Sequence, residues 1–325
     1  MYFCQSKFKN QSKMDKNIFG NITDCLGSKE DRYFSNGFKS VEVMYNDFRC
    51  EDGILSSNIN VRQGKRWSKK NGENLKPHLG TTEFVSIAAV VAQRLLQKEK
   101  GLIDHDLEIS WISRFTCKVR QCTDIDHNCI SVMGKIISTD AHVDIFSKSI
   151  IQVQIGSVQV MLHVCHPDTI SSESCKNTDN AVDFYQKGYK YRDHDITNII
   201  LDIEKMTSCG KVILYDENTL KKGIGAKYSG MMFTDFVLVT GQLTQALLYG
   251  LNNSDREKSN NMWLREIDVW CELPPMEKKC NSEIKFLNVN ILNINGESWQ
   301  SVTLSGSLGN MNSKIKVAQK INQSL

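Results

Sequence analysis

The sequence predicts an α+β protein that contains the same structural unit twice. The main observation is a repeated segment: Thr81–Leu96 (TTEFVSIAAVVAQRLL) aligns with Phe233–Leu248 when the chain is shifted by 152 residues, and six of the sixteen pairs are identical. At the same shift Trp111 aligns with Trp263, each inside a run of β-branched and aromatic residues. Two matches at one spacing, without a gap, indicate an internal duplication.

Each copy of the repeated segment is predicted to be a buried helix. Thr82 and Thr234 can cap the first turn, and the acid that follows each of them suits the positive end of the helix dipole. The segment FVSIAAVVAQRLL is apolar on almost every face, so protein must surround it. With about 16 residues it is too short to span a bilayer, which takes about 20. We therefore expect wrapped helices at 82–96 and 234–248.

The other elements are predicted as strands, in the same order in both halves. Alternating apolar residues predict first-half strands around Val41–Tyr45 and at 53–61, 107–119, 129–138 and 145–164, with a turn at Gly156–Ser157. Second-half strands are expected at 196–204, 211–215, 262–273, 283–292, 298–308 and 313–321. A basic, glycine-containing loop precedes each helix.

This order of elements, in which two strands and a loop lead into a buried helix followed by three or four long strands, is that of the hot-dog fold, whose sheet wraps one helix. The sequence therefore predicts a tandem (double) hot-dog, with two halves related by a pseudo-twofold axis. The expected boundaries are a polar N-terminal tail at 1–27, a first domain at 28–175, and a linker with the second domain at 176–325.

Composition narrows the class of protein. A chain of 325 residues can hold two domains, and a net charge of +3 gives no reason to expect nucleic acid or membrane as a partner. Eleven scattered cysteines are typical of free thiols in a reducing compartment. The first 20 residues are polar, without the apolar core of a signal peptide. We expect a soluble cytoplasmic protein, compatible with a monomer because the two halves already form a pseudo-dimer.

Sequence motifs for cofactors and metals are absent. There is no dinucleotide fingerprint, phosphate loop or nucleophile elbow, so we expect no cofactor. Cys165–His166 and the Asp140–His142–Asp144 group lack a second set of ligands at zinc spacing, so no metal is expected. A dehydratase-type hot-dog would carry a helical Glu 14 positions after the loop histidine His78, but Ala92 stands there.

Three segments, LGSKEDRYFSNGFKSVE, GMMFTDFVLVTGQLTQALLYGL and MWLREIDV, resemble the avirulence protein D family of plant-pathogenic bacteria. That family is associated with syringolide biosynthesis, and it is similar in logic to the A-factor-type butenolide synthases. The resemblance implies a biosynthetic enzyme that condenses a 3-oxoacyl thioester of coenzyme A or acyl carrier protein with a ketopentose, xylulose. It implies acyl transfer to a sugar hydroxyl and an aldol-type cyclisation to a butenolide precursor. It implies no particular catalytic residues.

Candidate site residues follow from the residue types at the two helix starts, where free backbone N–H groups can polarise a thioester carbonyl. His78 is the candidate base, and Asp235 and Glu83 are the candidate catalytic carboxylates, with Asp235 and the second half preferred. The alternative for both acids is a purely structural role at the helix dipole. A polar substrate could satisfy the buried amide of Gln242, and so could a loop carbonyl.

Further residues are expected to bind substrate. Glycines allow the backbone to approach a ligand closely, and basic side chains in the loops suit the phosphates of coenzyme A or an acidic carrier protein. The substrate-binding candidates besides Gln242 are Thr234, Gly230, Gly80, Arg62, Lys65 and Arg66. Lys69, Lys70, Lys76, Lys221, Lys222 and Lys227 extend the basic loops, whose alternative role is plain solvation. Trp67 is expected to be exposed among these charges, as at an interface.

Two other functions remain open at this point. One is an acyl-thioester hydrolase or dehydratase of the hot-dog superfamily, and the other is a non-catalytic protein that binds acyl ligands or acts as an elicitor. Incubation with a 3-oxoacyl thioester, with and without xylulose, separates them, because only a hydrolase consumes the thioester without the sugar.

Overall fold

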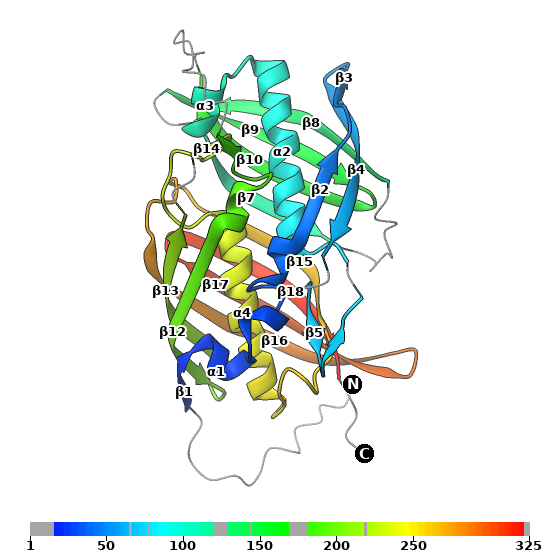
Figure 1. The fold of residues 1–325 in the computed structure, drawn as a ribbon, viewed down its shortest axis with the longest axis vertical. Helices are drawn as coiled ribbons and strands as arrows, with labels where there is room; N and C mark the ends of the chain where they lie inside the picture. The colour runs from blue at the N-terminus through cyan, green and yellow to red at the C-terminus, as the bar shows by residue number, and fades with distance from the viewer. Residues whose placement is uncertain are drawn as a thin grey trace.

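One large antiparallel sheet forms the body of the molecule in the computed structural model (Figure 1), which describes residues 16–64, 67–76, 78–119, 129–142, 145–168, 181–217 and 220–321. The sheet has 14 strands in the order β1-β12-β13-β16-β17-β18-β15-β7-β10-β9-β8-β4-β2, with β3 paired to β4 beside this path. Two long helices, α2 (Thr81–Lys100) and α4 (Phe233–Leu251), lie against it. The fold is therefore α+β, as predicted.

The two halves of the sheet have the same strand order. From edge to centre the first half contains β2 (Val41–Tyr45), β4 (Ile54–Gln63), β8 (Ile130–Ala141), β9 (Phe146–Ile155), β10 (Val158–Pro167) and β7 (Trp111–Lys118). The second contains β12 (Arg192–Asp202), β13 (Thr207–Asp216), β16 (Lys279–Ile294), β17 (Glu297–Leu308), β18 (Met311–Lys320) and β15 (Met262–Trp270). Short elements complete the chain: β1 (Lys16–Asn21), α1 (Ile22–Leu26), β3 (Arg49–Glu51), β5 (Lys69–Lys70), β6 (Glu73–Asn74), α3 (Asp104–Glu108), β11 (Val182–Asp183), β14 (Lys221–Lys222) and three 3-10 turns, η1 (Lys29–Asp31), η2 (Gly37–Ser40) and η3 (Gly188–Tyr191).

The halves join where β7 pairs with β15, and the register of this pair is symmetric. Thr116 stands opposite Asp268, the residue 152 positions later in the chain. On either side of it, Lys118 pairs with Glu266 and Arg114 pairs with Trp270. The strand register therefore has the same spacing as the sequence repeat, which places a local twofold axis at the centre of the sheet.

Both long helices are buried, as predicted, but their first turns differ from the prediction. They begin at Thr81 and Phe233, so that Thr82 and Thr234 lie inside the first turn and do not cap it. The acids close the turn instead: the N–H of Gly80 donates to Glu83 Oε2 at 2.7 Å, and the N–H of Met232 donates to Asp235 Oδ2 at 2.6 Å. Each carboxylate thus satisfies a backbone donor that the helix leaves free.

The expected polar tail at 1–27 is wrong for residues 16–26, and residues 1–15 lie outside the described part. Residues Lys16–Asn21 form β1, which pairs with β12 at the outer edge of the second half. Ile22 and Leu26 of α1 are buried. A free β12 edge would expose unpaired backbone groups, and β1 covers it. A short, mainly polar strand has little apolar periodicity, so its pattern did not predict a strand. The predicted strand at 107–119 is also shorter than expected, because Leu107 belongs to α3.

The first segment of each half crosses to the helix of the other half. The carbonyl of Phe34 accepts from Gln242 Nε2 in α4 at 3.2 Å. The carbonyl of Tyr185 accepts from Ser86 Oγ in α2 at 2.6 Å. These two hydrogen bonds are reciprocal, and each holds the crossing segment of one half against the long helix of the other half.

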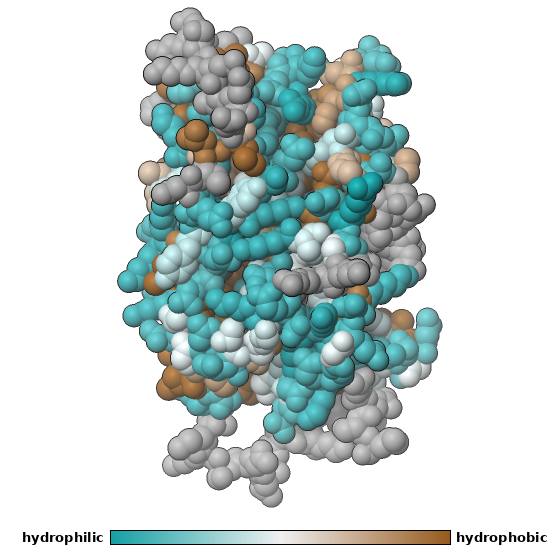
Figure 2. Space-filling view, in the orientation of Figure 1, coloured by the Kyte–Doolittle hydropathy of each residue, from teal (hydrophilic) through white to brown (hydrophobic). Residues whose placement is uncertain are grey.

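The visible face of the molecule is mainly hydrophilic, with smaller hydrophobic areas between (Figure 2). Within the described ranges, no helix combines the length and apolar character that crossing a bilayer requires.

Candidate active site

A cavity of about 150 Å³ lies where the two halves meet. Apolar side chains from α4, β15 and β18, including Val237, Ile267 and Val317, form one part of its wall. Another part comes from the entry into α2, with Leu79 and Gly80 before the helix and Thr81 and Phe84 in its first turn. The cavity therefore combines an apolar chamber with a helix N-terminus, which is the setting expected for an acyl thioester.

An aromatic row lines the cavity. The ring centroids of Tyr33 and Trp67 are 5.4 Å apart, those of Trp67 and His78 are 4.7 Å apart, and those of His78 and Trp263 are 4.7 Å apart. His78, the predicted base, is thus part of the wall between two tryptophans. Trp67 is only 4% exposed, so its predicted exposure is wrong: it packs into the wall of the cavity.

Tyr33 and Glu83 form a short hydrogen-bonded pair beside the cavity. Tyr33 Oη donates to Glu83 Oε2 at 2.5 Å, and Glu83 Oε1 has no hydrogen-bond partner among the described residues. Burial raises the pKa of Glu83, although the hydrogen bonds from Tyr33 and the Gly80 N–H act in the opposite direction. Burial and the neighbouring carboxylate also raise the pKa of Tyr33. Because Tyr33 lines the cavity, this pair can exchange a proton with a bound molecule.

Gly80 explains how Tyr33 reaches Glu83. A Cβ atom at position 80 would collide with the hydroxyl of Tyr33 and would lie 2.8 Å from Glu83 Oε2. Gly80 also lines the cavity, as predicted from its position before the helix. The close approach that it allows is to the Tyr33 side chain.

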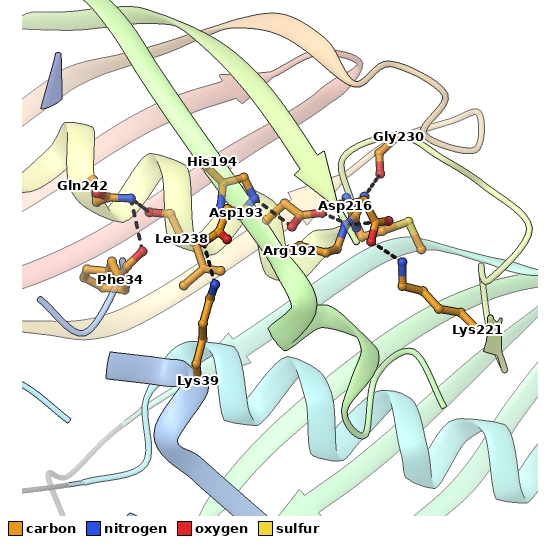
Figure 3. Close-up of polar contacts among 12 residues, drawn as sticks. Phe34, Lys39, Arg192, Asp193, His194, Asp216, Lys221, Gly230, Leu238 and Gln242 are labelled. Carbon is orange, nitrogen blue, oxygen red and sulfur yellow. Dashed lines mark hydrogen bonds and ion pairs between the residues drawn. The ribbon is translucent and has the colours of Figure 1, made fainter. Parts of the chain in front are cut away.

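Asp235 lies in a separate buried network at the start of α4, and Figure 3 shows its partners Arg192 and His194. Its Oδ2 accepts from Arg192 Nη1 at 2.5 Å, and its Oδ1 lies 2.9 Å from His194 Nε2. Burial alone would raise the pKa of Asp235, but Arg192 and His194 outweigh it and hold the pKa below its usual value. The cavity wall includes His78 but not Asp235. The structure does not bring this predicted pair together.

Gly230 and Thr234 belong to the same structural region and do not line the cavity. The carbonyl of Gly230 accepts from Arg192 Nη2 at 2.6 Å. The side chain of Thr234 is fully buried, and its hydroxyl has no partner among the described residues. Both residues serve the packing of the α4 start.

Gln242 is satisfied by the protein itself. Its Oε1 accepts from Arg32 Nη1 at 2.7 Å, and its Nε2 donates to the carbonyls of Phe34 and Leu238. The alternative of a loop carbonyl partner is therefore what the structure shows. Gln242 does not line the cavity, but two of its partners, Arg32 and Phe34, do.

The predicted basic rim is only partly present at the cavity. Lys65 and Arg66 lie outside the described residues, and Arg62 is exposed on β4, opposite Glu42 of β2. Lys221 pairs with Asp216. Lys70 does line the cavity, and its Nζ donates to the carbonyl of Ser259 at 2.6 Å.

Sequence reasoning missed Arg32, Tyr33 and Arg256 as cavity residues. One signal could have pointed to the segment that begins with Tyr33. Residues 33–40 and 184–191 form the same turn followed by a 3-10 helix, so that Gly37 corresponds to Gly188. This correspondence has a spacing of 151 residues, one less than the repeat between the helices, and an ungapped comparison passes over it.

Metal-binding side chains do not cluster in the described ranges: nowhere there do three His, Cys, Asp or Glu residues gather as an ion would require. His166 is occupied by protein, with its Nε2 2.8 Å from Ser149 Oγ and its Nδ1 2.9 Å from the carbonyl of Pro167.

Comparisons with known proteins give one family. A model of the Pseudomonas avirulence D protein (AvrD) family matches residues 17–322. No curated protein matches the chain. Three solved structures are similar over most of the chain. A hot-dog protein of unknown function from Alicyclobacillus acidocaldarius has 6% identity and a TM-score of 0.40, with 90% of this chain and 98% of that chain covered. A protein from Thermobifida fusca provisionally assigned as a thioesterase II has 9% identity and a TM-score of 0.40, with coverages of 89% and 99%, and a bifunctional dehydratase-cyclase domain of ambruticin biosynthesis has 8% identity and a TM-score of 0.35, with coverages of 86% and 95%. These TM-scores are below 0.5, so the fold rests on the strand order described above.

Proposed function

Since the chain belongs to the Pseudomonas avirulence D protein family, we propose that it is a biosynthetic enzyme that condenses a 3-oxoacyl thioester with a ketopentose, xylulose, to give a syringolide-type butenolide precursor. The observation that carries the proposal is the cavity between the halves. It joins an apolar chamber to the start of α2, and Tyr33, which lines it, is hydrogen-bonded to the Glu83 carboxyl group behind the wall.

The architecture in this proposal is a tandem hot-dog, with the first domain in residues 28–175 and the second in residues 176–325. The identical strand order in the two halves and the symmetric register about Thr116 and Asp268 support it. In such a pair the site lies between the domains, as this cavity does.

The acyl chain occupies the apolar side of the cavity, and the thioester carbonyl lies at the start of α2, where the helix dipole favours the developing oxyanion. A sugar hydroxyl attacks this carbonyl carbon and gives its proton to Tyr33 Oη, while the Tyr33 proton moves to Glu83. The C–S bond then breaks, and the proton returns through Tyr33 to the leaving thiolate. An ester has formed and a thiol has left.

The second step closes the ring. The carbon between the two carbonyls of the acyl group is acidic, and the Tyr33–Glu83 pair removes one of its protons. The carbanion attacks the ketone carbon of the sugar, and the alkoxide that forms takes the proton back from the pair. Loss of this hydroxyl as water, with the remaining proton of the attacking carbon, gives the butenolide. In this proposal His78 holds the sugar by its position in the cavity wall. Basic residues of the segment before α2, such as Arg62 and Lys69, receive the phosphates of coenzyme A or an acidic carrier protein.

The test is a product analysis with the purified chain. A 3-oxoacyl-coenzyme A is incubated with and without xylulose, and mass spectrometry follows the thioester, the free acid and the condensed product. We expect the condensed product only when xylulose is present. Hydrolysis at the same rate without sugar would instead assign a thioesterase, and an unchanged thioester with tight acyl binding would assign a binding protein.

A further inference from the structure

The polar end of the cavity contains three cationic side chains, Arg32, Lys70 and Arg256. No Asp or Glu stands among the described residues that line the cavity. Arg256 has an ion pair, at 3.0 Å, with Glu257, whose side chain is 47% exposed. Burying several positive charges with few negative partners costs free energy, and a bound anion would lower that cost.

Arg32 is the centre of this group. Its side chain is only 2% exposed, and its Nη2 has no hydrogen-bond partner in the part of the chain that the structure describes. The rest of the guanidinium is fixed: Nε donates to the carbonyl of Ser28 at 3.1 Å, and Nη1 donates to Gln242 Oε1 at 2.7 Å. A buried guanidinium held from two sides, with one nitrogen unused, is preorganised to donate to an oxyanion.

The other two cations are also held by neutral groups. Arg256 Nη2 donates to the carbonyl of Asp31 at 2.5 Å and to Ser68 Oγ at 3.2 Å. Lys70 Nζ donates to the carbonyl of Ser259. Burial and the charge of Arg256 lower the pKa of Arg32 to about 10 and that of Lys70 to about 8, so the three charges act on one another as well as on the cavity.

We propose that Arg32, with Lys70 and Arg256, forms an oxyanion-binding subsite of the cavity, which takes a phosphate monoester or a carboxylate carried by the substrate. Because the aliphatic chain of the donor fits the apolar side, the anion belongs to the smaller, polar reactant. Read together with the proposed function, on which this last step rests, the acceptor is a sugar that carries an anionic group. Gln242 is the positioning residue that aims the Arg32 guanidinium.

The subsite is tested by isothermal titration calorimetry of the full chain with inorganic phosphate and, in a parallel arm, with acetate. We expect saturable binding of one of the two anions to the natural chain, and binding roughly 10-fold weaker or more for Arg32→Gln, as for loss of a charge-assisted hydrogen bond. Arg49→Gln is the matched control, since Arg49 is exposed on β3 outside the cavity. The arm that binds identifies the chemistry of the anion.

Circular dichroism checks the fold of each variant, and Lys70→Met decides the matter if Arg32→Gln does not fold. Absence of saturable binding in both arms, or equal affinity in the natural chain and in the folded cavity variant, would overturn the subsite. Condensation assays with a ketopentose and its terminal phosphate ester separate the two proposals. Condensation of the free sugar without any anion binding would support the proposed function and reject the subsite. Anion binding without any condensation would support the subsite and reject the proposed function.

Discussion

At the scale of single residues, the two equivalent acids of the repeat have different environments. Asp235 is buried with a cation, Arg192, and its pKa is lowered. Glu83 is buried with a neutral partner, Tyr33, and its pKa is raised. A carboxyl group with a raised pKa beside a cavity is the better acid/base, and a permanently ionised one is the better structural anchor.

Asp235→Asn is expected to cost stability. The substitution removes the nearer counter-charge of the buried Arg192 guanidinium and leaves only the Asp216 carboxylate, 3.5 Å from Arg192 Nε. Breaking a buried ion pair in this way costs up to about 3–5 kcal/mol. Because the folded pKa of Asp235 lies below 3.8, its stabilisation is present above that pH and is lost as the pH falls through the lowered value. Urea unfolding at several pH values measures both effects. A loss of only about 0.3–1 kcal/mol would instead indicate a simple dipole role.

Glu83→Gln is expected to cost activity. It keeps the size of the side chain but removes the proton acceptor, so that condensation should fall by roughly 10²–10⁴. Since the pKa of Glu83 is raised above 4.5, the burial of this carboxyl group favours folding below that pH, and the advantage is lost as the pH rises through the raised value. The glutamine variant should lack this dependence. Full activity in a folded Glu83→Gln protein would transfer the acid/base role to another residue, with His78 the first to examine.

At the scale of elements, the two helix starts have the same capping geometry but different surroundings. Gly80 stands against the Tyr33 side chain, whereas a Cβ at Gly230 would lie 2.6 Å from the backbone of Met276 and Glu277. A side chain can move more easily than a backbone segment. A Cβ at position 80 would therefore displace the Tyr33 side chain, whereas a Cβ at position 230 would press on the backbone.

Gly80→Ala and Gly230→Ala therefore form a matched pair of tests. The first should displace Tyr33 and lower the condensation rate, with a stability loss of about 1–3 kcal/mol from overpacking. The second should lose at least as much stability while the remaining folded protein keeps its turnover number. Thermal unfolding and steady-state kinetics on both variants measure the difference. Equal turnover in the two variants would show that the position of Tyr33 does not matter.

At the scale of the whole molecule, neither half can form the cavity alone. Arg32 and Tyr33 come from the first half, and Val237, Trp263 and Ile267 come from the second. The halves also share one sheet through β7 and β15. The two halves are similar in fold, but they contribute different residues to the described cavity, which lies at the start of α2.

A chain limited to residues 28–175 tests this dependence. It exposes the edge of β7, which normally pairs with β15, and a free edge strand seeks another strand. We expect dimers or aggregates by size-exclusion chromatography and no binding of an acyl-coenzyme A. A monomeric fragment that binds the ligand would contradict the shared cavity.

The sequence by itself determined the α+β class, the duplication, the two buried helices and most of the strands, because these depend on local periodicity and on a repeat at constant spacing. The candidates His78 and Gly80, chosen because both precede the first helix, line the cavity, whereas the preferred candidate, Asp235, does not. Only the tertiary structure decided which acid contacts the cavity wall, because Glu83 and Asp235 look alike in sequence and differ in the partner that packing gives them. Glu83 is hydrogen-bonded to Tyr33, which lines the cavity, and Asp235 is hydrogen-bonded to Arg192, which does not. The same holds for Arg32 and Gln242, which are 210 residues apart in the chain and meet only where the two halves pack together.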